Sequence, residues 1–186
     1  MTERYILASQ SPRRKQLLEW AEIPFDIRVA DTDESYPAGL TAGQVAEHIA
    51  RNKAAVIAPL EPGRTVIAAD TIVVLDEEII GKPANREAAI STLLRLSGRS
   101  HQVITAVALR RDEREELFHD VTEVAFHPLT EEQVTFYVDK YQPYDKAGAY
   151  AIQEWIGVVG IQSVRGDFYN VMGLPVSRVV QALSSF

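Results

Sequence analysis

Residues 5–20 read YILASQSPRRKQLLEW, and this stretch predicts a short buried strand over its first four residues and a helix over its last ten. Ser11 is a preferred residue for a helix N-cap, and Pro12 suits the first helical position. Leu17 and Leu18 give that helix an apolar side. A strand that runs directly into a helix is typical of α/β proteins.

The first turn of the predicted helix carries three positive side chains, Arg13, Arg14 and Lys15. The N-terminus of a helix bears a partial positive charge and favours acidic residues, so these cations oppose the helix dipole unless an anion is bound. Free backbone N–H groups, the dipole and guanidinium groups together make a binding site for phosphate. We interpret the turn as a phosphate site; a solvated basic surface turn is the alternative.

Beyond this first unit, predicted strands and helices alternate, and one pair of strands forms a hairpin. Strands are expected at 25–29, 65–75, 79–80, 102–109 and 117–126, and helices at 41–58, 86–96, 177–183 and from Thr130 onward. An acidic loop occupies residues 31–39. This order predicts an α/β fold with a mixed β-sheet and flanking helices, and the absence of a linker predicts a single domain over residues 1–186.

The composition narrows the class of protein. A net charge of −7 disfavours a protein that coats nucleic acid, although a local basic pocket can still bind a small polyanion. No apolar run reaches the length of a membrane span, and the N-terminus lacks the apolar core of a signal peptide. With no cysteine, the chain has no disulfide framework and no thiolate nucleophile. We therefore expect a cytoplasmic protein with no membrane and no nucleic-acid polymer among its partners.

Two charged residues stand at apolar positions. Asp70 lies inside VIAADTIVVL at 66–75, where an ionised carboxylate is costly unless it is paired, binds a metal or faces a cleft. A structural carboxylate and an active-site acid are equally good interpretations of Asp70. Lys53 falls within the apolar stripe of the helix expected at 41–58. Its ammonium either reaches solvent along a packed stem or enters a pocket shared with Asp70.

Familiar phosphate, metal and nucleophile motifs are missing from the sequence. There is no G-x-x-x-x-G-K-[ST] loop, no G-x-G-x-x-G fingerprint, no H-E-x-x-H and no G-x-S-x-G. The four histidines also lack the spacing of zinc ligands. Phosphate binding would therefore rely on cationic side chains and a helix end, and any metal should be a hard ion held by carboxylates.

Seven segments, in their order and spacing, resemble the Maf family of nucleoside triphosphate pyrophosphatases. The segments are LASQSPRR at 7–14, ARNKA at 50–54, ADTIV at 69–73, GKP at 81–83, LSGRSHQV at 96–103, DKAGAYAIQ at 145–153 and NVMGLP at 170–175. The resemblance covers nearly the whole chain. It implies an inosine-triphosphatase-like α/β fold with two lobes around a central cleft. It also implies hydrolysis of a nucleoside triphosphate to the monophosphate and pyrophosphate.

The resemblance further implies roles for individual residues. Asp70 would accept a proton in the reaction. Because two acids could not usefully face a triphosphate without an intervening cation, we also expect Asp70 and Glu34 to hold a divalent cation, Mg²⁺ or Mn²⁺. Contacts to the substrate are implied for Ser9, Ser11, Arg13, Arg14, Lys53 and Lys82. Residues that match the subgroup hydrolysing dTTP and UTP are Arg13, Thr71 and Gln153.

Two positions leave the match open. In the acidic loop, Asp33 is an alternative to Glu34, and Asp167 stands where relatives often have a small residue. The expected activity is pyrophosphate release from dTTP and UTP, with removal of modified pyrimidine nucleotides as a further role. The alternative is a nucleotide-responsive regulator of septum formation that acts through partner binding. Relatives often form dimers, so a homodimer is expected from the resemblance alone.

Overall fold

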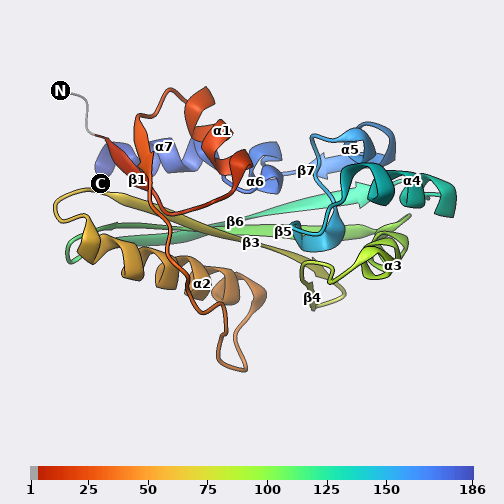
Figure 1. Ribbon diagram of the computed structural model, residues 1–186, viewed down its shortest axis with the longest axis horizontal. Coiled ribbons are helices and arrows are strands. Elements are labelled where there is room, and N and C mark those ends of the chain that lie inside the picture. Colours follow the sequence, from red (N-terminus) through yellow and green to blue (C-terminus); the bar gives the residue numbers. More distant parts are fainter. Residues whose placement is uncertain (1–3) are drawn as a thin grey trace. The chain divides into compact units, whose positions relative to one another are not determined.

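The computed structural model describes residues 4–186 (Figure 1). Its strands are β1 (Tyr5–Leu7), β2 (Phe25–Ile27), β3 (Val66–Leu75), β4 (Glu78–Ile80), β5 (Ser100–Arg111), β6 (Arg114–Phe126) and β7 (Ile161–Arg165). Its α-helices are α1 (Pro12–Trp20), α2 (Ala42–Ile57), α3 (Arg86–Leu96), α4 (Glu131–Tyr141), α5 (Trp155–Gly160), α6 (Phe168–Met172) and α7 (Val176–Ser185). Two short 3₁₀ turns complete these elements, η1 (Ala58–Leu60) and η2 (Ala147–Ala149).

The strands of residues 4–186 form one mixed sheet. Its order is β2-β1-β3-β5-β6-β7, and β4 pairs with β3 outside this path. β1 runs parallel to β2 and β3, whereas β4 is antiparallel to β3, and β7 is antiparallel to β6. The predicted α/β fold with a mixed sheet and flanking helices is therefore confirmed.

The chain divides into two compact units. The first consists of the chain up to Thr71, of Thr105–Asp120 and of Gly173–Phe186. The second consists of Ile72–Ile104 and Val121–Met172. The boundary passes through β3, β5 and β6, so each unit is built from several separate segments of sequence. The single domain expected over residues 1–186 remains a prediction.

In the first unit, side-chain caps fix the starts of the two longest N-terminal helices. The Ser11 hydroxyl accepts from the backbone N–H of Arg14 at the start of α1. Thr41 and Gln44 form a reciprocal capping box at the start of α2. Figure 1 shows α1 and α7 on one side of this unit's strands and α2 on the other. The apolar faces thus buried include Ile6, Leu7, Leu17, Leu18, Val45, Ile49 and Ile67.

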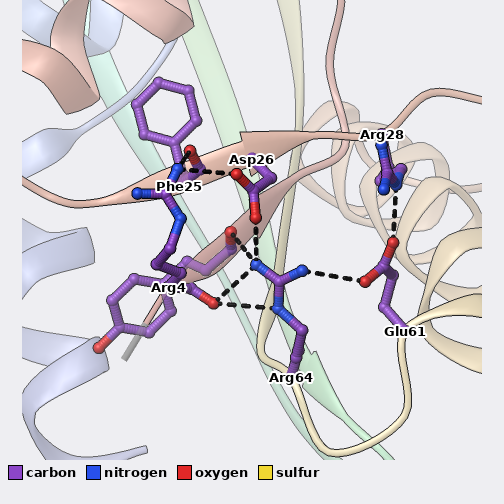
Figure 2. Close-up of polar contacts among 7 residues, drawn as sticks. Arg4, Phe25, Asp26, Arg28, Glu61 and Arg64 are labelled. Atoms are coloured by element: carbon purple, nitrogen blue, oxygen red, sulfur yellow. Dashed lines mark hydrogen bonds and ion pairs between the residues drawn. The ribbon is translucent and has the colours of Figure 1, made fainter. Parts of the chain in front are cut away.

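An ion-pair network joins β2 to the residues just before β1 and β3 (Figure 2). Asp26 on β2 accepts from Arg4 at 2.7 Å and from Arg64 at 2.6 Å. Arg64 also binds Glu61 at 3.1 Å, and Glu61 accepts from Arg28 at 2.7 Å. Hydrogen bonds from Arg4 and Arg64 lower the pKa of Asp26 to about 2. Because the network is on the surface, it adds little to the stability of the fold.

The second unit is built on the β3–β4 hairpin and the packed pair α3 and α4. Asp76 and Glu77 take up left-handed conformations, with φ values of 50° and 68°, which suit a tight two-residue hairpin turn. Helix α3 packs against α4. The buried side chains of this unit include Leu93, Leu96, Phe126, Tyr137 and Ile156.

The sequence does not predict α5, β7 or α6. The α5 segment reads WIGVVG, in which glycines and β-branched residues give little helix propensity. In α6, tertiary contacts decide the conformation, because Asn170 donates to the Val103 carbonyl at 3.0 Å and to Thr122 Oγ1 at 2.9 Å. Asp167 Oδ1 accepts from the Tyr169 N–H at 2.7 Å and so helps to start α6.

A buried imidazole lies in the core of the second unit. The His101 side chain is 3% exposed, stacks on Phe126, and has Nε2 2.7 Å from the Tyr150 hydroxyl. Within residues 4–186, His101 Nδ1 has no hydrogen-bond partner. Burial lowers the pKa of His101 from 6.5 to about 4, because a charged ring would lose its hydration. The folded protein therefore keeps this ring neutral at neutral pH.

We expect this histidine to make the protein acid-labile. Because the pKa of His101 is lower in the folded state, the unfolded state takes up a proton first as the pH falls below 6.5. The free energy of unfolding should then decrease by up to about 3 kcal/mol, and this loss is complete near pH 4. Urea unfolding of wild type and His101→Gln across this range measures it. His127→Gln, a change at an exposed ring, is the control, and an unchanged slope in His101→Gln would contradict the assignment.

Candidate active site

Three charged side chains of the first unit converge on one another. The ammonium of Lys53, on α2, lies 2.7 Å from Asp70 Oδ1 and 2.8 Å from Glu34 Oε1. The side chains of Asp70 and Lys53 are 13% and 18% exposed, whereas that of Glu34 is 51% exposed. Lys53 therefore directs its ammonium to Asp70 instead of to bulk solvent. A carboxylate in the middle of an apolar strand is stabilised in this way by a neighbouring charge.

The acidic loop contributes Glu34 to this cluster. Asp33 instead binds within its own loop, where its two carboxylate oxygens accept from the Ser35 N–H at 2.8 Å and the Ser35 hydroxyl at 2.7 Å. These hydrogen bonds, the one from the Ser35 side chain first, lower the pKa of Asp33. The two acids were alternatives in the sequence, and the geometry favours Glu34 as the one that faces Lys53.

Arg14 connects four parts of the first unit through its guanidinium. Its Nε donates to the Gly173 carbonyl at 2.7 Å, Nη1 to Ser9 Oγ at 3.2 Å and Nη2 to Thr71 Oγ1 at 3.0 Å. Burial lowers the pKa of Arg14, and the charge of nearby Asp70 opposes this shift. The guanidinium stays protonated, since its pKa starts far above neutral. These bonds use three of its five N–H donors, which leaves up to two for an anion.

The serines before α1 shape the turn that carries these cations. Ser9 Oγ accepts from the Ser11 N–H at 3.2 Å, and Ser11 Oγ accepts from the Arg14 N–H at 3.4 Å. Two N–H groups that could have bound phosphate are thus paired inside the protein. The expectation of free backbone donors at this helix end is met only in part, and binding of phosphate would depend more on the side chains.

Thr71 follows Asp70 on β3, and its hydroxyl is engaged by protein groups. Besides Arg14 Nη2, the Thr105 hydroxyl lies 2.9 Å from Thr71 Oγ1, and Thr105 is fully buried. Gly173, with φ of 118°, lies beside this hydroxyl: a Cβ there would be 3.6 Å from Thr71 Oγ1, at ordinary van der Waals distance. Sequence reasoning missed Thr105 and Gly173. A threonine inside the apolar run VITAVAL at 103–109 was the available signal for the first.

The remaining predicted residues are distributed as follows. Arg13 is in α1 beside Arg14, and its charge lowers the pKa of Arg14. Lys82 and Gln153 belong to the second unit, where both are exposed. Lys82 follows Gly81, whose carbonyl accepts from the Gly148 N–H at 3.3 Å.

The described residues offer a limited set of metal ligands. Across residues 4–186, no group of three or more histidine, aspartate or glutamate side chains is placed to hold a metal ion. Asp70 and Glu34 are two carboxylates that contact the same Lys53 ammonium. That donor set fits a hard cation that completes its coordination with water and substrate phosphates.

Among residues 4–186, no helix has the length and apolar character needed to cross a membrane.

The chain is similar in sequence, over nearly its whole length, to a described protein family and to named bacterial proteins. A family model described as "Maf-like protein" matches residues 4–186. A protein of Bacteroides thetaiotaomicron named dTTP/UTP pyrophosphatase is 49% identical over 176 residues, which are 94% of this chain and 91% of the relative. A protein of Bacillus velezensis with the same name is 47% identical over 186 residues, or 100% and 98% of the two chains. A solved HAM1 protein from Coxiella burnetii shares the fold, with a TM-score of 0.51 over 99% of this chain, 100% of that chain and 17% identity.

Proposed function

Because the chain belongs to the Maf family, we propose that it is an enzyme that hydrolyses dTTP and UTP to the monophosphate and pyrophosphate. The observation that carries this proposal is the convergence of Asp70 and Glu34 on the ammonium of Lys53. Asp70 directly precedes Thr71, whose hydroxyl accepts from Arg14. Relatives with 47% to 49% identity over nearly their full length carry the name dTTP/UTP pyrophosphatase and support the substrate class.

In the proposed reaction, water attacks the α-phosphorus. A bond forms between the water oxygen and phosphorus, the bond from phosphorus to the bridging oxygen breaks, and pyrophosphate leaves. Asp70 orients the water and accepts its proton. The substrate's negative charge is met by cationic side chains, so positioning and electrostatics supply most of the rate. We assign this contact to Arg13, Arg14, Lys53 and Lys82, with Ser9 and Ser11 shaping the turn.

Preference for a pyrimidine is assigned to Arg13, Thr71 and Gln153. The amide of Gln153 offers a donor and an acceptor, which match the alternating edge of thymine or uracil. The Thr71 hydroxyl contacts Arg14 and Thr105, so Thr71 acts on specificity partly by fixing the guanidinium. A modified pyrimidine nucleotide that keeps this edge of the base would be recognised by Gln153 in the same way.

A divalent cation, Mg²⁺ or Mn²⁺, is part of the proposal, and Asp70 and Glu34 would hold it. When bound, it would supply positive charge that offsets the repulsion of the two carboxylates by the triphosphate. We expect EDTA to abolish pyrophosphate release and excess Mg²⁺ or Mn²⁺ to restore it. Full activity after exhaustive chelation would contradict a metal at these carboxylates.

A substrate panel tests the proposed function. Pyrophosphate release is measured with dTTP, UTP, CTP, pseudouridine triphosphate and 7-methyl-GTP. We expect kcat/KM to be highest for dTTP, UTP or the modified uridine. Binding without turnover would instead indicate a nucleotide-responsive regulator. Since such triphosphates are cytoplasmic metabolites, we propose that the enzyme is cytoplasmic. We also propose that it forms a homodimer, and light scattering of the purified protein tests this.

A further inference from the structure

The turn that carries Gln153 is unusual in its burial. The side chains from Ala149 to Ile152 are 0% to 6% exposed, whereas Gln153 directly after them is exposed. A surface glutamine on an ordinary loop would have mobile neighbours. Here the segment before Gln153 is part of the core of the second unit, so buried contacts hold the backbone that leads into Gln153.

A single phenol holds both sides of this turn. Tyr137, on α4, is fully buried, and its hydroxyl accepts from the Ala151 N–H at 3.1 Å. The same hydroxyl donates to Glu154 Oε2 in a very short hydrogen bond. Ala151 lies two residues before Gln153, and Glu154 lies one residue after it. Tyr137 therefore bridges the two ends of the segment whose one exposed side chain is Gln153.

Further contacts limit the motion of the turn. The Glu154 N–H donates to the Ala151 carbonyl at 3.1 Å, which closes the backbone turn around Gln153. A Cβ on Gly157 would lie 1.7 Å from the Ile152 carbonyl oxygen, so α5 packs directly on the turn's backbone. Lys146, whose side chain is 10% exposed, lies 3.8 Å from Glu154 Oε1 and partly neutralises the carboxylate.

We propose that Tyr137 is a positioning residue for nucleotide selection, holding the 151–154 turn so that Gln153 meets the base in one orientation. The inference rests on the proposed function, because it assigns Gln153 to the base. A pre-organised amide binds its partner without losing conformational entropy, whereas a mobile one adapts to either pyrimidine. Tyr137 thus acts on discrimination between UTP and CTP more than on the chemical step.

The test compares Tyr137→Phe with Tyr141→Phe. Phenylalanine keeps the ring of Tyr137 and removes the hydroxyl that bonds the turn. Tyr141 is a second phenol on α4 that stacks on Tyr137, so it is a matched control. For Tyr137→Phe we expect the ratio of kcat/KM for UTP to that for CTP to fall about tenfold, the value of one hydrogen bond, with kcat for UTP changed less than about twofold. Tyr141→Phe should keep the wild-type ratio.

Gln153→Ala separates the two proposals. If Gln153→Ala leaves the UTP/CTP ratio unchanged, the assignment of Gln153 to the base fails, and with it the inference. If Gln153→Ala lowers the ratio but Tyr137→Phe does not, the positioning role alone is overturned. Adding Tyr137→Phe to Gln153→Ala should lower the ratio no further. A merely structural tyrosine would instead lower the melting temperature and reduce activity on both nucleotides equally.

Glu154→Gln provides a second variant in case Tyr137→Phe folds poorly. It keeps the shape of the side chain and weakens its bond to the Tyr137 hydroxyl by removing the charge. A reduced UTP/CTP ratio in Glu154→Gln, with kcat for UTP retained, supports the positioning role. A wild-type ratio in a folded Glu154→Gln protein overturns it.

Discussion

Replacing Asp70 by asparagine is expected to lower kcat for UTP by about 10²- to 10⁴-fold while the protein stays folded. Asparagine matches the size of aspartate but cannot accept the proton from water. Lys53 keeps its ion pair with Glu34 in the variant, so the ammonium does not lose every counter-charge. Pyrophosphate release at saturating UTP measures the loss, and calorimetric binding of a non-hydrolysable UTP analogue shows whether the triphosphate is still held.

Asp33→Asn is the matched control for this substitution. Asp33 is an acid of the neighbouring loop, but its carboxylate is engaged with Ser35. Its replacement should leave kcat within about twofold of wild type, since surface changes have small effects. If Asp70→Asn turned over at the wild-type rate, Asp70 would be a structural carboxylate that balances Lys53, which is the other interpretation of its position in the strand.

Local signals in the sequence account for most of the fold. Ser11 and Thr41 are capping residues, and the structure starts α1 and α2 directly after them. The α5, β7 and α6 elements were not predictable in the same way. They are short, and α6 depends on an asparagine, Asn170, that binds groups 48 and 67 residues away. A local window of sequence holds no information on such partners.

The candidate site was predictable where a residue type contradicted its surroundings. Asp70 in an apolar strand and Lys53 on an apolar helix face were both anomalous, and the structure pairs them at 2.7 Å. Their roles stay predictions, as do those of the other site residues. The contact of Arg14 with the Gly173 carbonyl was not predictable, because 159 residues separate the two. Tyr137 gave no signal either, since a tyrosine on the apolar face of a helix looks like an ordinary core residue.

Lys53→Met is expected to reduce kcat/KM for UTP by about 10²- to 10³-fold, the range found when one donor to a developing charge is removed. Methionine keeps most of the aliphatic stem of lysine, so packing against the apolar face of α2 is retained and only the ammonium is lost. The loss leaves Asp70 and Glu34 without their shared counter-charge and removes one cation from the triphosphate. Steady-state kinetics and thermal melting measure the two consequences separately.

Lys140→Met is the matched control, since Lys140 is exposed on α4 and its ammonium lies 5.3 Å from the centroid of the Phe136 ring. Its replacement should change neither kinetics nor melting temperature appreciably, because substitutions at exposed positions have small effects. If Lys53→Met kept wild-type kinetics and lost only stability, Lys53 would be a packing residue. A large kinetic loss in a protein that melts near the wild-type temperature assigns the ammonium to the substrate, because only its charge and donors have been removed.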